Sequence, residues 1–293
     1  MAYDQFDQPP TSQPPVPGLD FVRLGGDPED VITSLGPLAN LLGTWVGNHG
    51  WNVIAVPDMD NGKESFLLLV RPYIETITFA PLGAPVPDRG GEETLFITGL
   101  QYDLRVTDAE TNQPLHLENG MWLYLNEVQV LGGPSIVRQA TIPHGDSVLA
   151  LGQYTVENGP PQIPVINAIP DAGPDAPAGY TDPYLNGPID ASKLNTILQA
   201  AIQEQDIIQT ITFYVSTQND GGIVNIPFVV KHANASAFQG TFWIEKVKSQ
   251  ETGTVYEQLQ YVQQTNINFL PQFGNPTELI MWPHVNINTL VKQ

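Results

Sequence analysis

The stretch Leu38–Gly50, with the sequence LANLLGTWVGNHG, marks the point at which the chain changes character. Upstream of it, Asp27 and Pro28 are the residue types of a helix start, and apolar residues follow at helical spacing until Pro37 breaks or restarts the helix. From Thr44 onward, β-branched and aromatic residues cluster in runs separated by Gly, Pro, Asn and Asp. The stretch therefore predicts a short N-terminal helix that leads into the first strand of a β-rich fold.

Short links between the predicted strands favour an antiparallel meander. Asp60-Asn61-Gly62, Gly132-Gly133, Asp220-Gly221-Gly222 and Thr252-Gly253 all suit tight hairpins, because Asn and Gly tolerate positive φ. A dozen strands must close or form a sandwich to remove their edges. The predicted fold class is all-β, an antiparallel closed β-barrel of about ten or more strands. We expect strands near 44–57, 64–70, 73–80, 94–107, 115–125, 136–142, 147–156, 207–217, 223–231, 237–248, 255–270 and 278–291.

A long interruption divides these strands. Eight prolines between 157 and 188 exclude a sheet interior and predict a surface loop, so we place a Pro-rich insertion at 157–189. Asp190 then begins an amphipathic helix over 190–205, laid on a sheet or plugging one end of the barrel. The strands predicted before and after this interruption are alike in their residue types. We therefore expect a flexible Pro-rich arm at 1–26 and a single barrel domain from 27 to 293.

Composition excludes several classes of function. The 293 residues include 31 acidic and 11 basic side chains, for a formal charge of −20, which would repel nucleic acids and anionic membrane surfaces. The absence of cysteine excludes disulfides, thiolate metal sites and cysteine nucleophiles. No apolar run approaches the roughly 20 residues of a membrane helix. The amino terminus resembles no signal peptide, so the expected location is cytoplasmic.

Common catalytic signatures are absent from the sequence. It has no Gly-rich phosphate loop, no Gly-x-Ser-x-Gly and no His-Glu-x-x-His, and the acidic segment 58–64 fits a hairpin better than a calcium loop. The five histidines lack the short spacing of a zinc pair, and most carboxylates fit a solvated acidic surface. His116, Glu118 and His144 are weak candidates for acid–base catalysis.

Three segments, in order along the chain, resemble the nitrobindin-like heme-binding β-barrels, a calycin-type family. Leu38–Gly50 resembles the family's opening, in which a short helix precedes Gly-x-Trp-x-Gly. Pro114–Gly120 resembles its Pro-Leu-His-x-Glu-x-Gly strand, and Pro283–Leu290 resembles its last strand. These segments cover about 30 residues. The chain departs from the family in its length, in the insertion, and after Gly47, where His49 and Trp51 would narrow the pocket or face the iron.

The resemblance implies a heme b cofactor, with His284 as the iron ligand, and an open ferric heme that reacts with nitric oxide or peroxynitrite or with a related small oxidant or substrate. Any enzymatic activity would be heme-dependent, as an isomerase or a peroxidase. If His284 points inward, so do Asn286, Asn288 and Leu290, because side chains alternate along a strand. The other cofactor-binding residues that the resemblance implies are Trp45, Thr44, Gly47, His49 and Asn286.

Two alternatives stay open. One is a heme-free barrel that carries a hydrophobic small molecule on apolar wall positions such as Phe66, Ile77, Phe79, Phe213, Phe228 and Phe242. The other is a cofactor-independent isomerase or cyclase that uses the acid–base candidates above. The negative charge of the chain disfavours heme propionates unless a basic side chain offsets it. Candidates for that role are Arg71, Arg105, Arg138, Lys231, Lys246 and Lys248. The partner that we expect is a small molecule in the barrel, and an oligomer is possible.

Overall fold

The structure is a computed structural model that describes residues 26–58, 65–89, 94–125, 135–218 and 220–293. The predicted arm and the turns at 60–62 and 132–133 lie outside these residues. The elements are α1 (Pro28–Ser34), η1 (Gly36–Leu41), β1 (Gly43–Pro57), β2 (Phe66–Pro81), β3 (Val86–Arg89), β4 (Thr94–Asp108), β5 (Pro114–Tyr124), β6 (Ile136–Ile142), β7 (Asp146–Asn158), η2 (Asp182–Tyr184), α3 (Asn195–Ile202), β8 (Asp206–Ser216), β9 (Gly222–Asn225), α4 (Pro227–His232), β10 (Asn234–Lys248), β11 (Val255–Gln272) and β12 (Asn275–Lys292).

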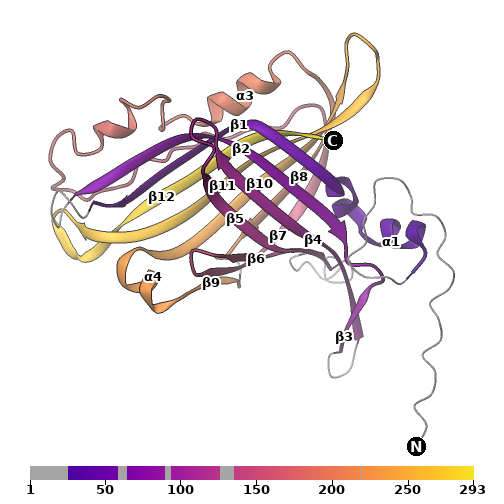
Figure 1. Ribbon diagram of the computed structural model, residues 1–293, viewed down its shortest axis with the longest axis horizontal. Coiled ribbons are helices and arrows are strands. Elements are labelled where there is room, and N and C mark those ends of the chain that lie inside the picture. Colours follow the sequence, from indigo (N-terminus) through magenta and orange to yellow (C-terminus); the bar gives the residue numbers. More distant parts are fainter. Residues whose placement is uncertain (1–25, 59–64, 90–93, 126–134, 219) are drawn as a thin grey trace, which may run out of the picture.

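In the described part of the chain, ten strands form a closed antiparallel ring. Its order is β1-β12-β11-β10-β8-β7-β6-β5-β4-β2, and the β1–β2 pairing completes the ring. The short strands β3 and β9 add to β4 and β7. Figure 1 shows the strands crossing the molecule obliquely, as ring closure requires. The predicted fold class, an all-β antiparallel closed barrel, is confirmed.

The predicted N-terminal helix closes one end of the barrel. Asp27 caps α1 by accepting from the backbone N–H of Glu29, and Pro28 occupies the first turn. The chain then continues as η1, and its leucines join the barrel core together with Trp45. The Trp45 indole is fully buried and donates to the carbonyl oxygen of Leu41. We call this end, formed by residues 35–45, the closed end.

The opposite end is open, and we call it the mouth. The β4–β5 and β6–β7 turns end there, whereas β1, β2, β11 and β12 continue past it. The interior between the two ends is filled largely by aromatic and aliphatic side chains, including Trp122, Phe213 and Phe242. A ligand site at the mouth therefore ends where the packed core of the barrel begins.

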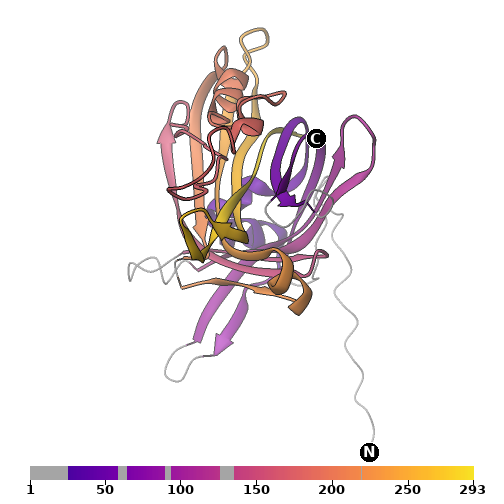
Figure 2. The same cartoon turned by 90° about the vertical axis from the view of Figure 1, so that its left-hand side faces the viewer.

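The Pro-rich insertion lies outside the barrel. Its apolar side chains pack with outward-facing residues of β1, β11 and β12, including Val53, Val285 and Ile287. Figures 1 and 2 show the insertion and α3 running along one side of the long strands. Of the two placements predicted for the inserted helix, the structure has the one on the sheet. The division into an arm and a single domain stays a prediction.

Three details of the predicted elements were wrong. The inserted helix spans 195–202 and not 190–205, because the Asp190 carboxylate accepts from Ser192 in a turn before the helix. The strand predicted at 223–231 ends at Asn225, and Pro227 begins α4. The strands at 64–70 and 73–80 are one strand, β2. Pro72 is tolerated because β4 pairs with β2 only from Tyr73 onward, so Pro72 lies beyond the β4 ladder.

Candidate functional site

His284 lies on the interior side of β12 at the mouth. Farther along the same strand, Asn288 and Leu290 are fully buried in the barrel, as the alternation of side chains predicts. The His284 Nε2 lies 2.7 Å from the Asn52 Oδ1 of β1 and 3.2 Å from the Asn286 Nδ2. The two amides hold the orientation of the imidazole.

The His284 ring is neutral. Burial, together with the smaller effects of the nearby His116 and His144 charges, lowers its pKa to about 3. A neutral imidazole is the form that binds metals. The effect of the other two rings on this pKa indicates that His116 and His144 lie near His284, which their separation in the sequence does not reveal.

His116 and His144 stack side by side at the mouth. Their ring centroids are 5.5 Å apart, and the planes are inclined by 28°. His116 lies on β5, and its Nε2 is 3.2 Å from the Glu118 Oε2. His144 lies in the β6–β7 turn, where burial and the His116 charge lower its pKa. The structure therefore brings the acid–base candidates His116, Glu118 and His144 together.

A buried charged layer forms the floor beneath these histidines. Glu118 accepts hydrogen bonds from Arg138 and Tyr102, and the Arg138 Nη1 donates to Gln263 across the barrel. Burial raises the pKa of Glu118, but the Arg138 guanidinium and the His116 contact outweigh it and lower the pKa to about 2. Glu118 is therefore ionised, and it fixes His116 through Nε2 while leaving Nδ1 for other partners.

A second polar group lies deeper in the barrel, around Glu75 of β2. The Glu75 Oε2 accepts from the Tyr261 hydroxyl at 2.6 Å and from the Asn288 Nδ2 at 2.8 Å. The Tyr261 hydroxyl is also 2.7 Å from that of Tyr73. Burial raises the pKa of Glu75 to about 7, despite these two hydrogen bonds. The barrel interior thus holds one ionised carboxylate, Glu118, and one carboxyl group that titrates near neutrality.

Thr44, Trp45 and Gly47, three of the other residues implied by the family resemblance, lie away from His284, whereas Asn286 contacts it. Trp45 pairs with Lys292, eight residues along β12 from His284, or roughly 27 Å at the rise of an extended strand. Thr44 bonds to the Thr78 hydroxyl, and Gly47 lies against Asn288 and Leu290. Their predicted part in cofactor binding is not tested by this placement.

Neither of the two bulky residues that depart from the family pattern fills the mouth. His49 is exposed, within a bulge between Gly47 and Gly50 where the β1–β2 register shifts. The bulge changes which residues face inward, so Trp51 packs outside against the insertion and Asn52 points into the barrel. The simple alternation counted from Trp45 would have turned Asn52 outward, which is why sequence reasoning missed it.

Two of the six apolar wall positions named for a carrier were wrong. Ile77, Phe79, Phe213 and Phe242 do belong to the barrel core. Phe66, however, packs outside with Trp282, and Phe228 is exposed on α4. The interior positions are occupied by side chains that pack on one another.

Arg71 is the basic side chain best placed for an anionic group at the mouth. It pairs across the sheet with Asn52, which itself contacts His284, and its guanidinium lies 3.7 Å from the Glu110 carboxylate. Arg138, by contrast, is buried with Glu118. Among the described residues, no three His, Asp or Glu side chains are grouped to hold a metal ion on their own.

Fold and site together define a closed ligand-binding barrel whose mouth presents a neutral histidine. Residues 34–164 match the family model of the THAP4-like, heme-binding beta-barrel domain, so the nitrobindin-like resemblance is confirmed over that part of the chain. No curated protein matches the chain. Among the parts of the chain that the structure describes, no helix is long and apolar enough to cross a membrane.

A comparison with solved structures also gives a match. The crystal structure of Rv2717c from M. tuberculosis is 17% identical, with a TM-score of 0.43. The match covers 89% of this chain and 97% of that one.

Proposed function

We propose that this protein binds heme b at the mouth of the barrel, with His284 as the iron ligand. The observation that carries the proposal is the neutral His284 imidazole, half-buried on the inner wall of the mouth and held by Asn52 and Asn286. The family match supports a heme ligand in general terms. Because His284 lies beyond the family-matched segment, its role rests on the geometry and on the last-strand motif.

The residues at the mouth fit this cofactor. Because the packed core begins at the Arg138 layer, the residues that would hold the cofactor are those of the mouth, His284 and Arg71 among them. Arg71 then reduces the electrostatic cost of two carboxylates on a protein of charge −20. Binding requires a free lone pair on the His284 ring. Because Asn52 and Asn286 both contact Nε2, the two contacts can stay in place only if Nδ1 is the ligand.

When bound, heme supplies an iron centre that can react with nitric oxide, peroxynitrite or a related small oxidant. The chain's own residues contribute orientation and proton handling. Asn286 and Asn52 hold the His284 ring. His116 can accept or release a proton at Nδ1, because Glu118 engages its Nε2. His144 is neutral near pH 7 and lies beside it. A peroxynitrite isomerisation to nitrate fits such a site.

Titration of the purified protein with hemin tests the proposal. We expect a saturable site with a sharpened Soret band, and a His284→Ala variant that loses this band. His232→Ala is the matched control, because that histidine is exposed on α4 and should leave the band unchanged. An unaltered band in His284→Ala would reject this ligand, and no saturable site in the wild type would reject heme binding.

A cofactor-independent acid–base enzyme is the second candidate function. The observation that favours it is the His116–Glu118 pair, in which a carboxylate held by Arg138 and Tyr102 orients an imidazole at the mouth. A protein that binds no hemin, yet whose activity is lost in His116→Ala while its fold is retained, would favour this function. Its substrate class would be a small molecule that needs one positioned proton donor or acceptor.

A further inference from the structure

The outer surface of the barrel has one side covered and one side bare. The insertion covers β1, β11 and β12 with its own apolar residues. On the other side, β5, β6, β7 and β9 turn a face to solvent that carries the exposed side chains of Met121, Leu149 and Val224. We call this surface, together with α4, the bare face. Figure 1 places β9 and α4 away from the insertion.

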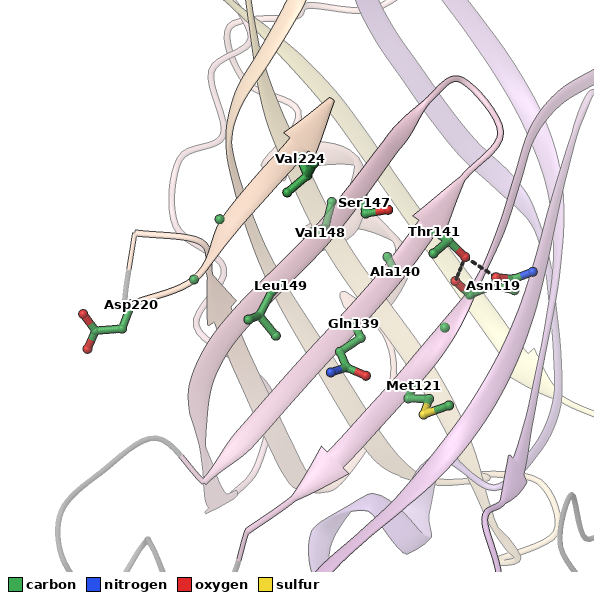
Figure 3. Close-up of a pocket in the computed structure, with 13 residues that line it drawn as sticks. Asn119, Met121, Gln139, Ala140, Thr141, Ser147, Val148, Leu149, Asp220 and Val224 are labelled. Atoms are coloured by element: carbon green, nitrogen blue, oxygen red, sulfur yellow. Dashed lines mark hydrogen bonds between the residues drawn. The ribbon is translucent and has the colours of Figure 1, made fainter. Parts of the chain in front are cut away.

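A groove of about 630 Å³ crosses the bare face. Figure 3 shows Met121, Gln139 and Leu149 along its length and Val224 at its β9 side. Asn119 and Thr141 hydrogen-bond to each other across two strands and leave few polar groups for a partner. The groove is therefore an apolar depression bounded by one acidic residue, Asp220.

An apolar ridge stands directly beside the groove. It consists of the turn after β9 and the helix α4, with exposed Ile226, Phe228 and Val230. The Phe228 side chain is 69% exposed and Val224 is 74% exposed, which is unusual for adjacent large apolar residues on a soluble surface. The bare face thus carries both the groove and the ridge, and Val224 lies where the two meet.

The charge of this region differs from that of the rest of the chain. From Gly221 to Ile244 the sequence has no acidic residue, although the whole chain has 31. Lys231 stands on the ridge and Asp220 at the rim of the groove, separated by the length of β9. Two copies of a protein of charge −20 repel each other, so the bare face, on which Lys231 offsets the charge of Asp220, is where they can approach.

We propose that the bare face is a homodimer interface, in which a two-fold axis places the ridge of each copy in the groove of the other. In such an isologous contact, opposite ends of one patch meet. Lys231 of each copy then faces Asp220 of its partner, and Phe228 enters the apolar groove. A second copy of this chain supplies both the ridge that fits the groove and the charges that pair with Lys231 and Asp220.

Sedimentation equilibrium of the full chain provides the first test. We expect a monomer–dimer equilibrium whose dissociation constant rises at least about tenfold in Phe228→Asp, as for a central apolar anchor. Val165→Asp is the matched control, because Val165 is equally exposed but lies on the insertion. An equal effect in both variants, or a wild type that is monomeric at all concentrations, would overturn the proposal.

Charge reversal provides a sharper test. Lys231→Asp and Asp220→Lys should each weaken the homodimer, because each places like charges together. Mixed in equal amounts, the two variants should form a heterodimer, since both of its contacts pair Asp with Lys. The positive φ of Asp220 adds a small local strain to the lysine variant, but this strain is the same alone and in the mixture.

Two outcomes would contradict this interface. Failure of the mixture to associate more tightly than either variant alone rules out the Lys231–Asp220 pairing and with it the two-fold arrangement. A monomeric wild type that co-sediments with phosphatidylcholine vesicles, and loses this binding in Phe228→Asp, would assign the ridge to a lipid surface instead.

Discussion

Single carboxyl groups in this protein behave differently according to what surrounds them. Glu118 is ionised because Arg138 lies beside it. Glu245 of β10 is buried, and within the described part of the chain it has no basic partner and accepts a hydrogen bond only from Gln258. Burial raises its pKa to about 8, although the hydrogen bond from Gln258 opposes the shift. Glu245 therefore keeps its proton in the folded state at neutral pH.

The Glu245→Gln variant should change how stability depends on pH. The folded pKa of Glu245, about 8, lies above the ordinary value of 4.5 for a glutamate, so the favourable contribution is complete below pH 4.5 and is lost as pH rises through 8. Between pH 4.5 and 8, the free energy of unfolding of the wild type should fall relative to that of the variant, by at most about 1.4 kcal/mol per pH unit. Urea unfolding between pH 4.5 and 8.5 measures the difference.

An exposed acid, Glu204, supplies the control for that measurement. Glu204→Gln should leave the slope of stability against pH unchanged. Glu75 also titrates near pH 7, so the comparison has to be made between variant and wild type and not on the wild type alone. Parallel curves for Glu245→Gln and the wild type would show that Glu245 does not carry this dependence.

At the scale of whole elements, α3 anchors the insertion to the barrel. Leu194 and Leu198 are fully buried in the cluster formed with Val285 and Ile287 of β12. The Leu198 carbonyl also accepts from the Gln260 Nε2 of β11. This short helix thus adds both apolar and polar contacts to the packing of the insertion's own residues on the barrel.

Leu198→Ala should lower the free energy of unfolding by about 2–5 kcal/mol, because it leaves a cavity between the helix and the sheet. Limited proteolysis should then cleave the insertion before the barrel. Leu185→Ala, at an exposed position of the same insertion, should change stability by no more than about 0.5 kcal/mol. Similar effects of the two substitutions would mean that α3 does not hold the insertion in place.

The sequence predicted the elements better than the contacts between them. Apolar alternation located most strands, and Asp27-Pro28 located α1, because these signals are local. The segment after Asn225 failed, since an apolar run rich in valine fits a strand as well as a helix, and Pro227 decided in favour of a helix start. The helix start at 195 failed because Asp190 can cap a turn as readily as a helix.

The candidate site was only partly predictable for a similar reason. Alternation along β12 predicted that His284 shares a face with Asn286, Asn288 and Leu290, but it left open whether that face is the inner one, because Val285 and Ile287 on the other face are also apolar and buried. The pairing of Glu118 with Arg138 depends on strand register across β5 and β6, and Asn52 depends on the bulge in β1. Register and bulges are set by the packing of the whole barrel, so no single segment of the sequence contains them.

At the scale of the whole molecule, the dominant electrostatic feature is that acidic side chains outnumber basic ones, so ion pairs cannot neutralise all of them. With 31 acidic and 11 basic residues, at least 31 − 11 = 20 acids have no basic side chain of their own. Mutual repulsion of these charges opposes the compact state. Salt shortens the range of that repulsion, from roughly 30 Å at 0.01 M to roughly 3 Å at 1 M.

The melting temperature should therefore rise as NaCl is increased from about 0.01 to 1 M at pH 7. Each kcal/mol of relieved repulsion is worth about 2–4 °C for a chain of this size, so a rise of several degrees is expected. Near the isoelectric point of about 4.3 the net charge vanishes, and the same salt series should have little effect. Scans at two protein concentrations separate screening within a molecule from salt-promoted association, because only association depends on concentration. A melting temperature that falls with salt at pH 7 would show that attractive pairs, and not the excess of acids, govern the electrostatics of the fold.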